Sequence, residues 1–153
     1  MKITSRGRYA VMALVRLAGA SRGNPVALKG IARDEQIPEQ YLQQLFIRLR
    51  RRNLVKSVRG PGGGFILARH PSMITVGEII RTAEGKEPRV GCRGAGRTCG
   101  MIGTCRTQNM WETLESKIFE FLDSISIEDL FLDKASTVFY WHRGKWLKLT
   151  GMD

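Results

Sequence analysis

A helix with two unlike faces is predicted by Pro38-Glu-Gln-Tyr-Leu-Gln-Gln-Leu-Phe-Ile-Arg-Leu-Arg-Arg-Arg52. Its apolar residues recur at spacings of three, one and three, in the order Leu42, Leu45, Phe46 and Leu49. This spacing places them on one face of the helix, which a core can cover. Pro38 suits the first helical position, and Glu39 suits the positive end of the helix.

Two shorter segments before it complete a helical unit. Residues 28–36 repeat apolar residues at 28, 31 and 32, which predicts a short amphipathic helix joined to the long one by Gln36-Ile37-Pro38. Two helices joined by so tight a connection predict a helix-turn-helix. Further upstream, residues 9–18 are nearly all apolar with Arg16 as their only charge. They predict a buried first helix behind a cap at Thr4 or Ser5.

The opposite face of the long helix carries amides and cations. Gln pairs bidentately with adenine in the major groove, and Arg pairs with guanine or phosphate. Because recognition helices use their N-terminal residues to reach base edges, the expected base-reading residues are Gln40, Gln43 and Gln44. The residues expected to contact mostly phosphate are Arg48, Arg50, Arg51 and Arg52. Gln and Arg are also good helix formers, so an ordinary exposed face is the alternative.

A β-hairpin is expected after this helix. Residues 54–58 alternate as a strand, and residues 65–68 are suited to be its partner. Between them lies the tip Arg59-Gly-Pro-Gly-Gly-Gly64, which exposes backbone and carries one cation. Such a tip can enter a narrow minor groove, where the negative potential favours Arg, although a plain turn is the simpler alternative. The expected DNA contacts therefore also include Tyr41 of the helix and, at the tip, Arg59, Gly60 and Pro61.

The positive charge of the chain is concentrated in one half. The net charge is +11. Residues 1–70 hold 14 Lys and Arg, and their only acidic residues are Asp34, Glu35 and Glu39. Residues 71–153 hold 11 basic and 11 acidic residues, so their net charge is zero. This one-sided distribution is typical of a domain that binds a polyanion, with a surface charged for solubility as the alternative. No apolar stretch is long enough to span a bilayer, and the N-terminus lacks the apolar core of a secretion signal. We therefore expect a cytoplasmic protein with reduced thiols and no membrane contact.

The cysteines of the chain all lie in one glycine-rich segment: Cys92, Cys99 and Cys105. An odd number of thiols cannot all pair within one chain, whereas three thiolates on a pliable loop can wrap a soft metal centre. From Pro88 to Met110 the segment has arginines and no acidic residue, which favours thiolates. Three alternatives stay open. One is a zinc site, for which only the distant His70 or His142 could complete the ligand set; the others are a thiol switch without metal and inert thiols.

Four motifs along the chain form a specific set. They are Thr4-Ser-Arg-Gly-Arg-Tyr-Ala-Val11, Tyr41-Leu-Gln-Gln-Leu-Phe-Ile-Arg-Leu-Arg50, Leu54-Val-Lys-Ser-Val-Arg-Gly-Pro-Gly-Gly-Gly-Phe65 and Val76-Gly-Glu-Ile79. Together they closely resemble the bacterial Rrf2 family of winged-helix regulators, in particular its iron–sulfur cluster regulators. The resemblance extends from residue 1 to about residue 132. It implies a homodimeric transcription factor, such as a repressor, that binds a palindromic operator in double-stranded DNA.

The resemblance also implies one iron–sulfur cluster per subunit, 2Fe-2S or 4Fe-4S, that controls DNA binding. Cys92, Cys99 and Cys105 match the three cysteine ligands of the family in order, and Arg59 matches its wing arginine. The fourth ligand in the family is a His three residues after the last Cys, or an acidic residue near position 8 of the partner subunit. This chain has Gln108 and Arg8 at those positions, so the cluster type and its fourth ligand stay open.

Three helices and a tail are predicted beyond residue 74. Thr75-Val-Gly-Glu78 is a capping-box signature that opens a helix to Ala83, and Ser126-Ile-Glu-Asp129 opens a short one that ends near Asp133. Between them a long helix carries an apolar stripe at steps of three and four: Trp111, Leu114, Ile118, Phe121, Leu122 and Ile125. Because so much apolar surface must be covered, we expect it to pair two subunits, with an intramolecular core as the alternative. Residues 134–153 mix aromatic residues with cations, and the sequence leaves their role open.

The predicted fold is mainly α-helical with a small β-hairpin wing: a winged helix-turn-helix followed by a long C-terminal dimerisation helix. Its expected parts are a DNA-binding domain at 1–84, a cysteine loop at 85–108, the dimerisation and capping helices at 109–133, and a tail at 134–153. An enzyme is not expected, because the chain has two His, no recognisable acid–base pair and no Gly-Lys-Ser/Thr ending after its glycine run. The expected regulator senses iron–sulfur, iron, redox or nitric oxide status. A cluster-free thiol-redox or zinc-dependent regulator of the same fold is the alternative.

Overall fold

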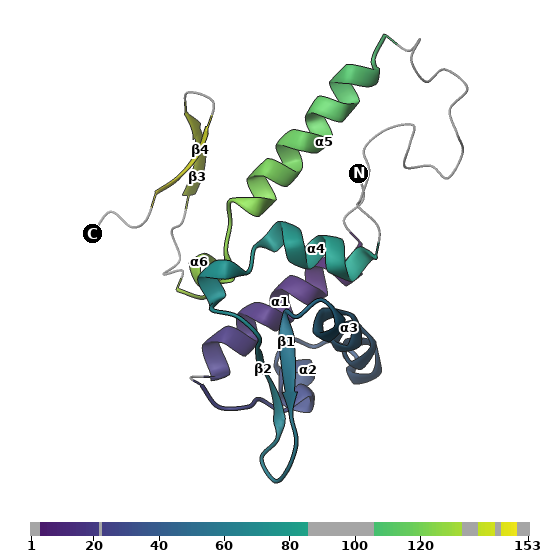
Figure 1. The fold of residues 1–153 in the computed structure, drawn as a ribbon, viewed down its shortest axis with the longest axis vertical. Coiled ribbons are helices and arrows are strands. Elements are labelled where there is room, and N and C mark those ends of the chain that lie inside the picture. The colour runs from purple at the N-terminus through teal and green to yellow at the C-terminus, as the bar shows by residue number, and fades with distance from the viewer. Residues whose placement is uncertain (1–3, 22, 86–105, 133–137, 143–144, 150–153) are drawn as a thin grey trace.

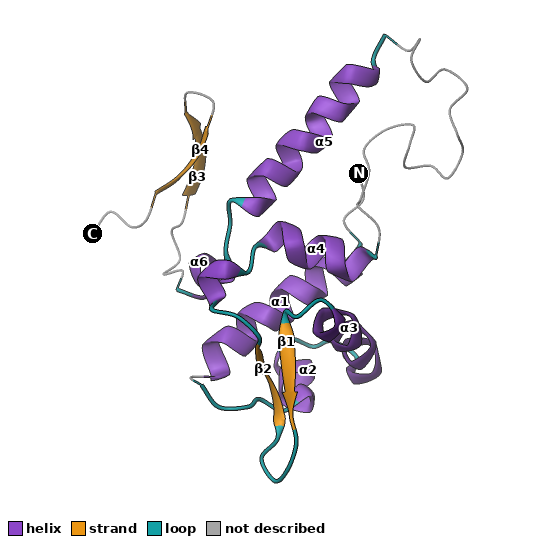
Figure 2. Ribbon diagram, viewed as in Figure 1, coloured by secondary structure: helices purple, strands orange, loops and turns teal. Residues whose placement is uncertain are grey.

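The computed structural model describes residues 4–21, 23–85, 106–132, 138–142 and 145–149. Its helices are α1 (Ser5–Ser21), α2 (Leu28–Asp34), α3 (Glu39–Arg51), the 3-10 turn η1 (Pro71–Met73), α4 (Val76–Glu84), α5 (Gln108–Asp123) and α6 (Ile127–Phe131). Its strands form two antiparallel pairs, β1 (Val55–Val58) with β2 (Gly64–Leu67) and β3 (Val138–His142) with β4 (Lys145–Leu149). Helices predominate, as the sequence predicts (Figures 1 and 2).

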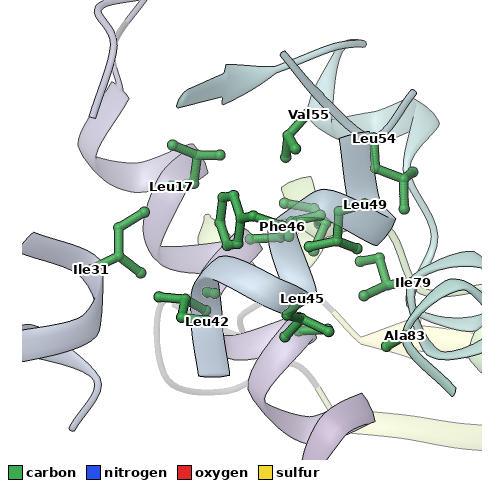
Figure 3. Packing of buried hydrophobic residues seen from close by; sticks show 14 of the residues in the cluster. Leu17, Ile31, Leu42, Leu45, Phe46, Leu49, Leu54, Val55, Ile79 and Ala83 are labelled. Carbon is green, nitrogen blue, oxygen red and sulfur yellow. The ribbon is translucent and has the colours of Figure 1, made fainter. Parts of the chain in front are cut away.

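The core lies where α1, α2, α3, β1 and α4 meet. All the predicted apolar residues of α3 are buried there, with exposed fractions of 2 % or less: Leu42, Leu45, Phe46 and Leu49. The Phe46 ring stands at the centre of the cluster (Figure 3) and meets the Phe65 ring of β2 edge-on, with 4.9 Å between centroids. Burying one such side chain stabilises the fold by about 1.5–3 kcal/mol. The inner face of α3 is therefore buried in the core, and its outer face is exposed.

The predicted wing is present. In the β1–β2 pair, Val55 lies opposite Leu67 and Val58 opposite Gly64, so both strands lie within one residue of the predicted ranges. A third segment joins this sheet, because Val26 and Phe65 exchange backbone hydrogen bonds of 2.9 Å in both directions. A Cβ at Gly64 would overlap the backbone of Val26, so only glycine permits this approach. The sheet thereby fastens the wing to the segment that precedes α2.

Helices α4 and α6 begin with side-chain caps. The Thr75 hydroxyl accepts a hydrogen bond from the Glu78 N–H at 3.2 Å and caps α4. The Glu78 carboxylate instead accepts from Arg69 at 2.7 Å, so the Thr75 half of the predicted box is present while Glu78 serves a different partner. At α6 the box is complete: Ser126 and Asp129 each accept from the backbone N–H of the other. These caps define the positions at which the two helices start.

Three details of the prediction are wrong. Pro38 is the N-cap of α3 and Glu39 its first residue, so the proline lies one position outside the helix. Ile125 is not on the α5 stripe, because the helix ends at Asp123; Ile125 lies in the connection to α6 and is 6 % exposed. The buried residue of α5 is Phe119, which the stripe leaves out. Phe119 is recruited by a cation, as described below, and apolar spacing alone does not reveal that partner.

Part of the tail, whose role the sequence leaves open, is ordered as a hairpin. Strands β3 and β4 pair in register, with Val138 opposite Leu149 and His142 opposite Lys145. In Figure 1 this hairpin is separate from the winged helix-turn-helix. It lies beyond the stretch that shows the resemblance given above.

Candidate DNA-binding surface and cysteine segment

The outer face of α3 exposes most of the residues predicted to meet DNA. Those exposed on α3 and its C-cap are Gln40, Gln43, Gln44, Arg48, Arg50, Arg51 and Arg52. Gln43 donates a hydrogen bond from Nε2 to the Glu39 carboxylate at 3.3 Å, one turn earlier. This contact holds the Gln43 amide along the helix surface and occupies one of its two N–H donors, which leaves the other N–H and the carbonyl oxygen to bind elsewhere. The α3 surface thus presents amides at its N-terminal end and cations at its C-terminal end, as a recognition helix requires.

Tyr41 belongs to the packing between α1 and α3. Its ring is half-buried and meets the Tyr9 ring of α1 edge-on, with centroids 5.8 Å apart and an interplanar angle of 88°. Both rings also pack against the main core. Tyr41 therefore orients α3 on α1 at the end of the helix that carries Gln40, Gln43 and Gln44.

Arg48 has a partner inside the domain. Its guanidinium donates a hydrogen bond from Nη1 to the backbone carbonyl of Ala83, in the last turn of α4, at 3.2 Å. The sequence gives no signal for this contact, because a carbonyl acceptor 35 residues away has no side-chain signature. The expected phosphate contact of Arg48 stays a prediction: the residue is exposed, and one of its guanidinium nitrogens binds within the domain.

The wing is connected to α3 by a short and well-defined turn. Asn53 follows the helix with φ of +56°, and the Leu54 N–H donates to the Leu49 carbonyl at 3.0 Å. A left-handed residue directly after a helix, with a backbone bond reaching back to the last turn, is a common helix C-cap, and Asn adopts this conformation more readily than most residues. Since Leu54 and Leu49 are both fully buried, the direction from α3 into β1 is fixed by packing as well.

The wing tip exposes Arg59, Gly60 and Pro61. The Gly63 N–H donates to the Gly60 carbonyl at 2.9 Å, and Gly60 and Gly62 have φ of +111° and +74°, which glycine adopts without strain. The tip points away from the helical body, at the end of the molecule opposite α5 (Figure 1). Together the wing tip and the α3 surface form one candidate DNA-binding surface.

One acidic side chain of the basic half is neutralised by neighbouring cations. Asp34 accepts hydrogen bonds from Arg16 at 2.5 Å and from Arg33 at 3.2 Å. The hydrogen bond from Arg16, followed by that from Arg33, lowers the pKa of the Asp34 carboxyl below its ordinary value. The same pairing raises the pKa of the Arg16 guanidinium. The electrostatic character of residues 1–70 therefore stays positive even where an acid interrupts it.

The predicted metal ligands Cys92, Cys99 and Cys105 lie outside the described residues. The described chain ends on one side at α4, whose C-cap Gly85 has φ of +71°, and resumes before α5. Gln108, at one of the two fourth-ligand positions of the family, is the first residue of α5, and its Nε2 donates to the Glu112 carboxylate at 3.0 Å. Arg8, at the other, is an exposed cation that cannot ligate a metal. The donor set that fits a cluster is therefore the three thiolates.

The α5 stripe divides into two parts. Trp111 and Leu114 are 37 % and 42 % exposed, whereas Phe121 and Leu122 pack against Val76 and Ile80 of α4. Ile118 is half-buried between the two parts. Figure 1 shows the N-terminal part of α5 extending away from the other helices. The apolar surface that an intramolecular core leaves uncovered is therefore at this end of the helix.

Among the residues that the structure describes, no helix combines the length and the apolar character needed to cross a bilayer.

Comparison with known proteins identifies relatives across most of the chain. Residues 3–133 match the family model described as "Rrf2: Iron-dependent Transcriptional regulator". The HTH-type transcriptional regulator IscR of Pectobacterium atrosepticum is 39 % identical over 134 residues, which cover 88 % of this chain and 81 % of that protein. These relatives are transcriptional regulators and not enzymes, as the sequence predicts.

Two solved structures share the fold. The IscR structure from T. potens has a TM-score of 0.68 at 40 % identity and covers 85 % of each chain. The structure of CymR, the global cysteine regulator of B. subtilis, has a TM-score of 0.73 at 34 % identity and covers 86 % of this chain and 96 % of that one. The mainly helical fold with a hairpin wing is thus confirmed, and so is the resemblance on which the prediction depends.

Proposed function

The chain belongs to the Rrf2 family and is a DNA-binding transcriptional regulator of the IscR kind; from this premise we propose that it is a cytoplasmic homodimer that senses iron–sulfur, iron, redox or nitric oxide status through its cysteine segment. The observation that carries the proposal is the position of that segment. It joins α4, which contacts the recognition helix through Ala83, to α5, which exposes Trp111 and Leu114.

The DNA contacts follow from the candidate surface. Gln40, Gln43 and Gln44 read base edges from the N-terminal half of α3, and the cations that follow α3's Leu49, namely Arg50, Arg51 and Arg52, contact phosphate. Arg59, with Gly60 and Pro61, enters the minor groove. Tyr41 supports the helix from behind through Tyr9. All these residues except Tyr41 are exposed, which supports their assignment as DNA contacts.

Two subunits pair through α5. Trp111, Leu114 and Ile118 form the contact, and Phe121 and Leu122 connect it to α4 within each subunit. Exposed aromatic and aliphatic side chains on a helix that extends from its domain support this pairing. The dimer presents two copies of the DNA-binding surface to a palindromic operator, whose half-sites are read about one helical turn, ~34 Å, apart.

Cys92, Cys99 and Cys105 hold the sensing group, a 2Fe-2S or 4Fe-4S cluster in each subunit. Such a cluster supplies iron and sulfide that react with oxidants and nitric oxide or respond to iron supply. The arginines between residues 88 and 110 favour the thiolate form and offset the negative charge of a thiolate-ligated cluster. The name of the family model, an iron-dependent regulator, and the IscR relatives support this choice.

Analysis of the purified protein tests the proposal. We expect protein isolated without oxygen to contain iron and sulfide in proportion to subunits, with visible charge-transfer absorption, and the Cys92→Ser, Cys99→Ser, Cys105→Ser triple variant to contain neither. A DNA duplex selected from a random pool by the wild-type protein then reports binding by fluorescence anisotropy. The wild type should change affinity when the cluster is removed, and the triple variant should not respond.

A cluster-free regulator is the second candidate, and one relative favours it: a solved structure of Staphylococcus aureus CymR, 27 % identical with a TM-score of 0.73, is of an oxidized form. Zinc without sulfide in the purified protein would support a zinc-dependent regulator. Metal-free protein whose DNA affinity changes with a mild oxidant, and not in the triple variant, would support a thiol switch. Either result would overturn the cluster assignment and retain the DNA-binding homodimer.

A further inference from the structure

The C-terminal end of α4 contacts the recognition helix α3. The Arg48 guanidinium of α3 donates to the Ala83 carbonyl at 3.2 Å, and its Nη1 lies 3.1 Å from the position that a Cβ on Gly85 would occupy. The guanidinium thus lies over the last turn of α4. The carbonyl groups in a last helical turn lack intrahelical partners and carry partial negative charge, so a cation is favourable at this place.

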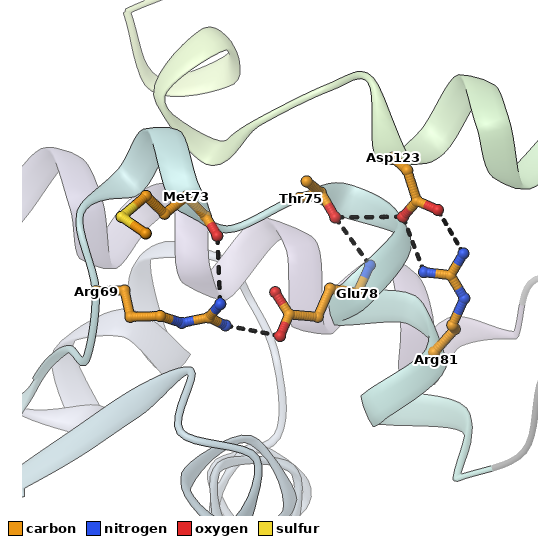
Figure 4. A network of polar contacts seen from close by, with 6 residues as sticks. All are labelled: Arg69, Met73, Thr75, Glu78, Arg81 and Asp123. Carbon is orange, nitrogen blue, oxygen red and sulfur yellow. Dashed lines mark hydrogen bonds and ion pairs between the residues drawn. The ribbon is translucent and has the colours of Figure 1, made fainter.

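Helix α4 also binds the C-terminal end of α5. Both carboxylate oxygens of Asp123 pair with the Arg81 guanidinium, at 2.8 and 2.5 Å, and the Thr75 hydroxyl donates to the same carboxylate at 3.3 Å (Figure 4). The Arg81 guanidinium also lies 4.4 Å from the centre of the Phe119 ring. A bidentate pair with a stacked ring fixes orientation as well as distance. This arrangement accounts for the burial of Phe119.

Apolar contacts support both fastenings. Ile79 and Ala83 of α4 are fully buried in the main core with α3, and Val76 and Ile80 join the smaller cluster that receives Phe121 and Leu122. Gly77 allows the close approach of α5, because a Cβ there would overlap the Asp123 carboxylate. Two different faces of one nine-residue helix therefore hold the recognition helix and the exposed helix.

We propose that α4 is a rigid bracket that sets the orientation of α3 relative to α5, with Arg48 and Asp123 as the positioning residues at its two contacts. The inference rests on the proposed homodimer. If α5 joins two subunits, the orientation of α3 on α5 determines where each recognition helix meets the operator. Arg48 then contributes to DNA reading through the spacing of half-sites and not through a phosphate contact.

Salt dependence separates the two roles of Arg48. The logarithm of the binding constant falls with the logarithm of salt concentration by about 0.9 for each phosphate contact, so a dimer that loses two contacts has a slope smaller by about 1.8. Arg50 is an exposed cation on the same helix, and we expect Arg50→Gln to reduce the slope by this amount. Arg48→Gln should leave the slope at the wild-type value.

Half-site spacing tests the bracket itself. The probe is a duplex selected from a random pool by the wild-type protein, with matched versions that have one base pair more or fewer between the half-sites. The wild type should bind the original spacing best. For Arg48→Gln and for Asp123→Asn, the ratio of the affinity for the original spacing to the affinity for the altered spacings should be lower than in the wild type, by roughly fivefold or more. Asp123→Asn retains every cation of α3, so its effect cannot come from a lost phosphate contact.

The outcomes separate this inference from the proposed function. Wild-type protein that sediments as a monomer would contradict the homodimer, and the salt slope of Arg48→Gln would still decide whether Arg48 contacts phosphate. A dimeric wild type whose variants melt normally and keep the spacing preference, or an Arg48→Gln slope as small as that of Arg50→Gln, would overturn the bracket. If Arg48→Gln melts too low to assay, Asp123→Asn, which leaves the Arg48–Ala83 contact intact, decides the question.

Discussion

The Glu84 carboxylate accepts a hydrogen bond from the Gly7 N–H at 3.2 Å, although these residues lie 77 positions apart. The same Oε1 accepts from the Thr4 N–H at 3.1 Å and from the Thr4 hydroxyl at 2.7 Å. Glu84 is the last residue of α4, and α1 has no acidic residue in its own first turn. The end of α4 therefore provides the negative charge that the first turn of α1 lacks.

Replacing Glu84 tests this remote cap. Loss of a cap that satisfies backbone N–H groups costs about 0.5–2 kcal/mol, so Glu84→Ala should lower the free energy of unfolding by that amount in urea titrations. Glu84→Gln is the matched control, because the amide keeps an acceptor oxygen and loses only the charge, and its effect should be smaller. An Ala variant as stable as the wild type would show that the contact contributes nothing.

Gly77→Ala should displace the Asp123 carboxylate from its partners Thr75 and Arg81. The added methyl group would overlap the Asp123 carboxylate, and overpacking of this kind typically costs about 1–3 kcal/mol. Gly30→Ala in α2 is the control, since nothing lies within 4 Å of a Cβ there and alanine favours the helix. Thermal unfolding should show a lower midpoint for Gly77→Ala and an unchanged or higher one for Gly30→Ala. The opposite order would contradict the close approach of the Asp123 carboxylate to Gly77.

The sequence predicts the winged helix-turn-helix well, because its information is local. The apolar spacing in residues 38–52 and the glycines of residues 60–64 each determine one element, and the structure places both within one residue of the predicted limits. Leu42, Leu45, Phe46 and Leu49 are buried for the same reason: a period of 3.6 residues leaves only one face for the core.

The contacts that the sequence does not predict are those between elements. Arg48 binds a backbone carbonyl, Arg81 draws Phe119 into contact, and Glu84 caps another helix. In each case the partner is distant along the chain, and at least one side is a backbone group or a ring face that no spacing rule identifies. The cysteine ligands stay predictions because they lie outside the described residues, and the DNA contacts stay predictions because they involve a second molecule.

Arg59→Ala should weaken DNA binding without affecting stability. Its side chain is at the exposed wing tip, and an exposed substitution usually changes the free energy of unfolding by less than about 0.5 kcal/mol. We expect roughly tenfold lower affinity for the selected duplex, about 1.4 kcal/mol. Lys56→Ala, an exposed cation of β1, removes the same charge away from the tip and should have a smaller effect. Equal losses of DNA affinity in the two variants would mean that Arg59 acts only through general charge attraction and that the wing tip has no specific role.

Leu114→Asp should dissociate the proposed dimer. Leu114 is 42 % exposed in the single subunit, and two unpaired carboxylates in an apolar contact would weaken pairing by on the order of 100-fold or more. Sedimentation across a range of protein concentrations measures this change. Leu132→Asp on the C-terminal side of α6 is the control, because it is 59 % exposed and outside the predicted stripe. A variant that stays dimeric at the wild-type concentration would exclude this end of α5 from the interface.

Acid should selectively remove the contribution of Asp34. Its pKa is lowered in the folded chain, mainly by the hydrogen bond from Arg16 and then by that from Arg33. A carboxyl group with a lowered pKa stabilises the fold fully above its ordinary pKa of 3.8, and the contribution is lost as the pH falls through the lower, folded-state value. The melting temperatures of wild type and Asp34→Asn should therefore differ at pH 7, and the difference should shrink as the pH falls below 3.8. Because the side chains of the Arg16–Asp34 pair are partly exposed to solvent, at 46 % and 29 %, the difference should also shrink in high salt. A difference that stays constant from pH 7 to pH 3 would mean that the Asp34 charge has no part in stability.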